Sequence, residues 1–159
     1  MPLTLHERAA HILRVKAPAL AHEATSALYR LRPELEHRYG ESGRLHCTKD
    51  IGHHLRFLAA AVEIADAKVF VDYAAWAARV MVTHNVAIED AVASFRCLLA
   101  VVPDAVSPES SPLVCEIISA ALASLDAHPP ASGIPARPRR QRATAFAAPS
   151  TTGSVPSRS

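Results

Sequence analysis

Glycine is scarce in this chain, with only five residues in 159, and the few that occur are scattered. Scattered glycines cannot build a glycine-rich phosphate-binding loop. The chain also has no GxSxG turn and no cysteine with a motif-supported histidine. We therefore expect no enzymatic activity and assign no catalytic residue.

Long apolar runs are also missing. No stretch of eighteen uncharged apolar residues occurs, so the sequence predicts no membrane-spanning helix. The first sixteen residues carry Glu7, Arg8 and Arg14 among their apolar positions, and so lack the apolar run of a signal peptide. We expect a cytoplasmic location.

The three cysteines, Cys47, Cys97 and Cys115, are widely spaced and odd in number. This pattern argues against a disulfide framework and against a zinc knuckle. Each cysteine falls on an apolar helical stripe, which favours small buried hydrophobic side chains.

The net charge of +2 conceals an asymmetry between the two ends of the chain. Residues 1–128 are net acidic, whereas residues 129–159 contain five arginines, six prolines and no acid. We expect a helical domain over 1–128 and a disordered basic tail over 129–159, because the tail has too few apolar residues to offset its ordering entropy. Only weak nucleic-acid contact is expected, through a cluster of four arginines, Arg137, Arg139, Arg140 and Arg142.

Apolar residues recurring every three or four positions predict an all-α fold, a single bundle of five to six helices. The first helical region runs from Thr4 to about Leu31 and contains Pro18. A proline in that position favours either two helices or one kinked helix, meeting near Ala17. A short helical turn follows over 34–39, closed by Gly40.

The clearest helix opens at Ser42-Gly43, and its stripe is Cys47, Ile51, His54, Leu55, Leu58, Val62 and Ala65. Asp66 is placed to cap the next helix, which we expect to end at Asn85. The apolar stripe of that helix is Val69, Phe70, Tyr73, Trp76, Ala77, Val80, Met81 and His84.

Two more helices complete the predicted bundle. One begins near Ala87 and runs until Pro103 ends it. The last is expected to start at Ser107-Pro108-Glu109, a cap followed by a first-turn proline and an early acid.

Nine histidines raise the question of a metal or haem site. His46, Asp50 and His53 share one helical face and are residue types that a transition metal accepts. Further ligands could come from Glu63, Asp72 or His84. Because HExxH and paired Glu-x-x-His motifs are missing, we assign no metal and keep this face as the alternative.

Haem would need a histidine inside an apolar pocket, and His54 or His84 could serve, although a core role is the more common one. Asp50 and His54 also stand one turn apart, a spacing that favours a hydrogen bond within the helix, with a pH-sensing imidazole as the alternative. Trp76, the single tryptophan, is expected in the core or at the edge of a pocket or dimer surface.

Three segments form a recognisable pattern: RYG-x-x-G-x-x-x-C over 38–47, D-x-x-x-HL-x-x-L over 50–58 and F-x-DY-x-x-W over 70–76. This pattern resembles the helical N-terminal region of bacterial regulators that carry a cobalamin (B12)-binding domain. The resemblance implies a sensory or regulatory helical module. The matching positions are Tyr39, Gly40, Cys47, Asp50, His54, Phe70, Asp72, Tyr73 and Trp76. The chain has no Asp-x-His-x-x-Gly motif to ligate cobalt, so cobalamin binding by this chain alone is not expected.

The sequence thus predicts a non-enzymatic sensory, regulatory or protein-interaction module with no cofactor. Its pocket or interface candidates are Asp50, His54, Tyr73 and Trp76, and a protein partner or a homodimer would dock on a helix face. The alternative is a helical sensor that binds haem or a transition metal.

Overall fold

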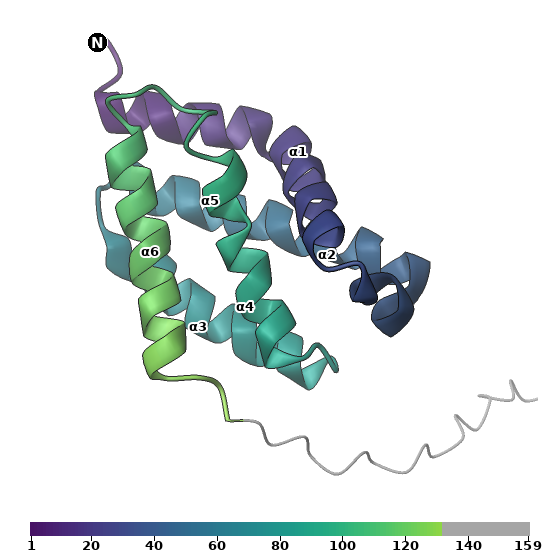
Figure 1. Cartoon of the computed structure of the whole chain (residues 1–159). Helices are drawn as coiled ribbons and strands as arrows, with labels where there is room; N and C mark the ends of the chain where they lie inside the picture. The colour runs from purple at the N-terminus through teal and green to yellow at the C-terminus, as the bar shows by residue number, and fades with distance from the viewer. Residues whose placement is uncertain (132–159) are drawn as a thin grey trace, which may run out of the picture.

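The computed structural model describes residues 1–131, and within them the chain is entirely helical, with no strand (Figure 1). The helices are α1 (Leu5–Leu31), α2 (Glu34–Glu63), α3 (Ala67–Thr83), α4 (Ile88–Arg96), α5 (Leu98–Val101) and α6 (Ser111–Ala127). The predicted all-α bundle is therefore confirmed. The predicted tail lies, from residue 132 on, outside the described residues, and the domain limit at 128 stays a prediction.

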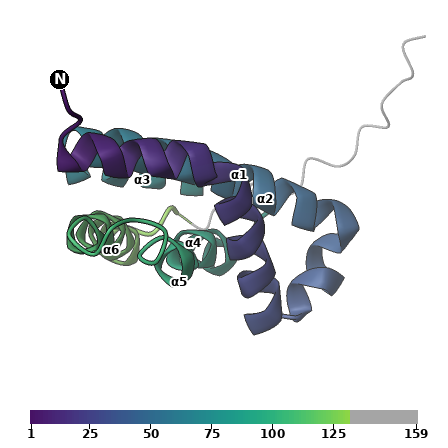
Figure 2. The ribbon, with the colours of Figure 1, turned by 90° about the horizontal axis from the view of Figure 1, so that it is seen from above.

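The helices form two layers that enclose the core (Figure 2). One layer holds α1, α2 and α3, and the other holds α4, α5 and α6. The most extensive packing joins α1 to α2 within the first layer and α3 to α6 between the layers. The largest side chains at the centre are fully buried: Phe70, Phe95, Leu13, Ile51, Leu55, Leu58, Leu98, Ile117 and Ile118. No helix in the described part of the chain is long and apolar enough to cross a bilayer.

α1 is a single helix that carries Pro18 in its interior. Its start is fixed by a capping box, in which Thr4 accepts from the Glu7 backbone and Glu7 accepts from the Thr4 backbone. The helix bends along its length (Figure 2), as expected when a proline removes an internal hydrogen bond. Of the two alternatives that the sequence left open, the kinked helix is therefore correct.

α2 is divided by Gly40, whose φ of 67° breaks the helical backbone as predicted. The break sets off a short segment, Glu34–Tyr39, which we call the α2 arm. Beyond it, Gly43 lies so close to the Tyr39 side chain that a Cβ at position 43 would clash with it. The glycines thus allow the arm to fold back over the longer part of α2.

Two predicted helix ends are confirmed. The Asp66 side chain accepts a hydrogen bond from the Lys68 backbone at 2.9 Å and caps α3. Asn85 takes the left-handed conformation, with φ of 66°, just after α3.

Two other predicted boundaries are wrong. The helix expected from Ala87 to Pro103 is interrupted at Cys97, where α4 gives way to the short α5. There the Ser94 hydroxyl and the Cys97 thiol bond to carbonyls of their own helix, a competition that bends helices. α6 starts at Ser111 rather than at Ser107, because the Ser107 carbonyl accepts from the backbone of residues 110 and 111 and closes a turn.

Candidate functional site

A cavity of about 420 Å³ lies between α2, α3 and the start of α4. It is mainly apolar, with a few polar groups directed toward it. Its lining is Tyr29, Leu35, Tyr39, Ser42, Gly43, His46, Cys47, Asp50, Val80, Met81, His84, Val86, Asp90 and Ser94. A largely apolar concavity with few convergent polar groups is typical of a small-molecule site.

Cys47 and Asp50 stand on this lining one turn apart on α2, both half-buried. The Asp50 carboxylate forms no hydrogen bond or ion pair with another side chain in the described part of the chain. Burial raises the pKa of Asp50, while the nearby His53, His46 and His84 act in the opposite direction. A carboxylate that has lost water without gaining a donor is poised to accept hydrogen bonds from a ligand.

The Cys47 thiol, predicted as a small buried side chain, is partly buried and packs against the core. Burial raises its pKa to about 11, only partly offset by a hydrogen bond to Thr25. The prediction of a buried cysteine holds for Cys97, whereas Cys47 and Cys115 are half-buried. The signal that could have identified Cys47 is its spacing of three from Asp50, which places a thiol and a carboxylate on neighbouring positions of one helix.

The α2 arm forms another wall of the cavity and is held there by Asp90. The Tyr39 hydroxyl donates to Asp90 Oδ2 at 2.6 Å and accepts from the Ala87 backbone at 2.9 Å. Arg38 pairs with the same Oδ2 at 2.5 Å. Arg32 lies 2.8 Å from Oδ1, within ion-pair distance but without the alignment of a hydrogen bond. Sequence reasoning did not find this cluster, because its members lie about fifty residues apart.

His54 is buried and both of its ring nitrogens are occupied. Nδ1 lies 2.8 Å from the Tyr73 hydroxyl and Nε2 lies 3.1 Å from the Ser94 hydroxyl, while the ring stacks on Phe95. The predicted hydrogen bond to Asp50 is therefore absent. Burial lowers the pKa of His54 to about 3, so the ring is neutral, and it has no free nitrogen for an iron atom.

The metal and haem alternatives fail on geometry as well. No group of three or more histidine, cysteine or acidic side chains within residues 1–131 is placed to hold a metal ion. His46 and His53 are exposed, and His53 does not line the cavity that His46 and Asp50 line. His84, expected in the apolar stripe, is exposed at the end of α3, and its Nδ1 lies 2.8 Å from the Val80 carbonyl oxygen.

Trp76 lies at the surface, not in the core, with 54% of its area exposed. Its neighbour Tyr73 stacks on Phe57, with ring centroids 4.0 Å apart, and Phe57 is itself 44% exposed. The four predicted candidates therefore occupy different environments. Asp50 lines the cavity, His54 and Tyr73 are buried behind it, and Trp76 faces solvent.

The family model described as phycobilisome protein matches residues 5–125, well over half of the chain. No curated protein matches the sequence. The match overturns the resemblance to the N-terminal region of cobalamin-binding regulators, whose matching positions include the buried core residues His54, Phe70 and Tyr73.

The match also corrects the predicted function and cofactor. Phycobilisome proteins are structural light-harvesting proteins that bind bilin chromophores covalently. The predicted sensory, regulatory or interaction module is therefore wrong, as is its haem- or metal-sensing alternative. The prediction of no cofactor is wrong for the same reason. On the extent of the match, the chain belongs to the phycobilisome protein family.

Proposed function

We propose that this chain carries a bilin, a linear tetrapyrrole, in the cavity around Cys47 and Asp50 and serves in light harvesting. The observation that carries the proposal is the pairing of a thiol and an unpartnered, half-buried carboxylate one turn apart on the wall of one cavity. A covalently held tetrapyrrole needs both a nucleophile for attachment and an acceptor for its pyrrole N–H groups.

The cavity suits such a group in size and lining. Its volume of about 420 Å³ falls within the range of ligand pockets, about 300–1,000 Å³. The apolar side chains of Leu35, Val80, Met81 and Val86 offer surface to the faces of the pyrrole rings. Asp50 offers a carboxylate whose hydrogen-bonding capacity no other side chain of the described chain uses.

Cys47 would form the covalent link. Its thiol adds across an exocyclic carbon–carbon double bond, so that Sγ bonds to one carbon and the thiol proton goes to the bilin. The reactive form is the thiolate, and the pKa of about 11 keeps that form scarce at neutral pH. Attachment is therefore expected to be slow unless the thiol is deprotonated locally.

Asp50 would hold the pyrrole nitrogens of the bound bilin and keep them protonated. The candidates behind the cavity would act indirectly. His54 and Tyr73 are joined to each other by a hydrogen bond, and they connect α2, the helix that carries Asp50, to α3. We propose that they position that helix.

The test is reconstitution of the full chain by co-expression with a haem oxygenase and a bilin reductase. The expected result is a coloured protein whose bilin stays attached in a denaturing gel, seen by zinc-enhanced fluorescence. The Cys47→Ala variant should lose this band. Cys115→Ala is the matched control, since Cys115 is also half-buried but lies on α6, outside the cavity.

A second variant distinguishes the hydrogen bonding of the bilin by Asp50 from its covalent attachment to Cys47. Asp50→Asn should keep the covalent band but lose most of the long-wavelength absorbance, because an amide holds pyrrole N–H groups less strongly than a carboxylate does. Attachment that persists in Cys47→Ala, or a folded protein that takes up no bilin at all, would overturn the proposal.

The family also informs the remaining predictions. Phycobilisome proteins assemble into oligomers with one another. We propose that this chain associates through a helix face, as the sequence predicted, and that it works as a pigment carrier and not as a catalyst. Its cytoplasmic location stays a prediction.

A further inference from the structure

A second concave surface lies on the first layer, between α1 and α2, away from the pigment cavity. We call it the basic groove. It has a volume of about 590 Å³ and is lined by Arg14, Ala17, Pro18, Ala21, His22, Arg44, Leu45, Thr48, Lys49, Gly52, His53 and Arg56. Every charged side chain on this lining is basic.

The cations of the basic groove differ in whether they already have partners. Arg14 and Arg44 each pair with a glutamate of their own chain. Lys49 and Arg56 are exposed and form no ion pair within residues 1–131. They lie seven residues apart on α2, about 10 Å along the helix axis. The groove therefore presents two unpaired positive charges on a lining that also holds small residues, such as Ala21 and Gly52, and the exposed Leu45.

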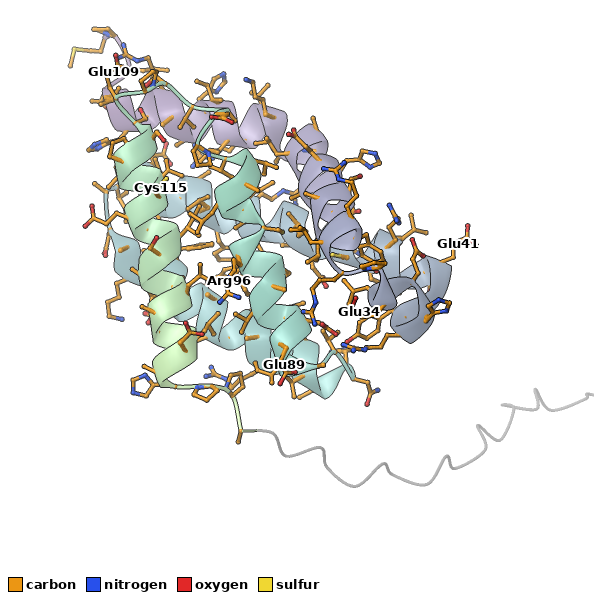
Figure 3. All side chains as sticks on the ribbon, in the orientation of Figure 1. Glu34, Glu41, Glu89, Arg96, Glu109 and Cys115 are labelled. Atoms are coloured by element: carbon orange, nitrogen blue, oxygen red, sulfur yellow. The ribbon has the colours of Figure 1, made fainter. Side chains whose placement is uncertain are left out.

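The second layer has the opposite charge. Residues 87–128 contain six acidic residues and one basic residue, Arg96. Asp90 is already neutralised by two arginines. The other five are exposed and form what we call the acidic face: Glu89, Asp104, Glu109, Glu116 and Asp126. Figure 3 shows Glu89, Arg96 and Glu109 spread over α4 and the region before α6.

α6 carries the part of the acidic face that fits a groove. Its outward stripe is Glu116, Ser119, Ala123 and Asp126, all exposed. The acids lie about 15 Å apart along the helix, and only small side chains stand between them. Small residues on both surfaces allow two helices to approach closely. Flexible lysine and arginine side chains can span the difference between 15 and 10 Å.

From this complementarity we infer that the basic groove of one copy of the chain binds α6 of a second copy. The two surfaces belong to different layers (Figure 2), so the contact is head-to-tail and a pair of copies keeps one free basic groove and one free acidic face. Such a contact propagates into a closed ring or an open stack. The inference rests on the proposed self-association, names the surfaces involved, and is independent of bilin binding.

The first experiment measures the association of the bilin-free full chain by sedimentation velocity. We expect oligomers at about 20 mM NaCl that dissociate at about 500 mM, where the Debye length falls to a few ångströms. A chain that is monomeric at low salt over the whole accessible concentration range would overturn the inference. Because no bilin is present, this outcome is distinguishable from a failure of the proposed pigment site.

Charge reversal identifies the surfaces. Lys49→Glu/Arg56→Glu and Glu116→Lys/Asp126→Lys should each weaken association at least tenfold. The matched control is Arg8→Glu/Arg79→Glu, a double reversal of exposed arginines outside the groove, which should associate like the unchanged protein. Thermal melts followed by circular dichroism establish that each variant is folded.

Mixing the two reversed variants is the decisive step. Alone, each has a groove and a face of like charge and should stay monomeric. In the mixture, the reversed groove of one variant meets the reversed face of the other, and the native groove of the second meets the native face of the first, so opposite charges face each other at both contacts. Association should therefore return in the mixture. Failure to return overturns the inference, as does groove-dependent binding of a single-stranded DNA probe by a protein that stays monomeric.

Discussion

Asp50 and His54 are neighbours on α2, one helical turn apart, yet their surroundings are opposite. His54 is buried, its two nitrogens both have hydroxyl partners, and its ring stacks on Phe95. Asp50 is half-buried beside a cavity and has no side-chain donor in the described structure. A polar group whose hydrogen bonds are all made within the protein supports the fold, whereas one left without partners beside a cavity is available to a ligand.

The largest expected effect is a loss of stability when His54, the partnered member of the pair, is replaced. His54→Ala removes a packed ring and leaves the Tyr73 and Ser94 hydroxyls without their partner. We expect a loss of about 3–4 kcal/mol in the free energy of unfolding, measured by urea denaturation. Asp50→Asn should change it by less than about 1 kcal/mol. Equal losses in the two variants would contradict the distinction.

The Asp90 cluster should give an intermediate effect. Asp90→Ala removes the acceptor shared by Arg38 and Tyr39 and releases the α2 arm. We expect a loss of about 2 kcal/mol, since both arginines remain partly solvated. Asp72→Asn is the control, because its pair with Lys68 is exposed and should leave the urea midpoint unchanged. Hydrogen exchange at the arm amides should rise in Asp90→Ala only.

The buried imidazole of His54 should also make the free energy of unfolding depend on pH. The folded-state pKa of His54 is lowered to about 3 from an ordinary value of 6.5, so the unfolded chain binds a proton that the folded chain does not. His54 therefore contributes full stability above pH 6.5, and this contribution falls as the pH drops from 6.5 toward 3. The unfolding equilibrium should shift by up to about tenfold per pH unit in that window.

His54→Gln isolates this dependence from that of the carboxyl groups. Its urea midpoint should vary less than that of the unchanged protein between about pH 7 and pH 5, where most carboxylates stay ionised. Parallel pH profiles for the two proteins would show that the imidazole titrates normally in the folded state.

The smallest expected effect is the reactivity of the Cys47 thiol at neutral pH. Alkylation of Cys47 by iodoacetamide, followed by mass spectrometry of the Cys47 peptide, should be slow at pH 7 and rise about tenfold per pH unit as the thiolate forms. The reason is the pKa of about 11 that burial imposes. Cys97, more deeply buried and with a pKa of about 12, should react more slowly still. A fast reaction at pH 7 would mean that the thiol is activated.

The sequence predicted the helices well because apolar periodicity reports which side of a helix meets the core. Asp66 and Asn85 marked their helix ends for local reasons, a side-chain cap and a left-handed backbone. The break at Cys97 and the late start of α6 were missed, because they depend on hydrogen bonds that the one-dimensional pattern does not specify.

The site was harder to predict than the helices. Periodicity placed Trp76 and His84 on the same stripe as Phe70, but in the structure both are exposed while Phe70 is buried. The cavity depends on α3 bringing Val80 and Met81 opposite Cys47, which only the assembled bundle shows. Asp50 was singled out in part for a hydrogen bond with His54, whose ring nitrogens lie beside Tyr73 and Ser94 instead.

The exposure of Trp76 makes the chain a convenient optical system. A single indole in contact with water emits at long wavelength, so folding will change its emission little and is better followed by circular dichroism. A light-absorbing group seated in a domain of this size cannot be far from that indole. Loss of tryptophan fluorescence therefore offers a label-free measure of pigment uptake that needs no engineered reporter.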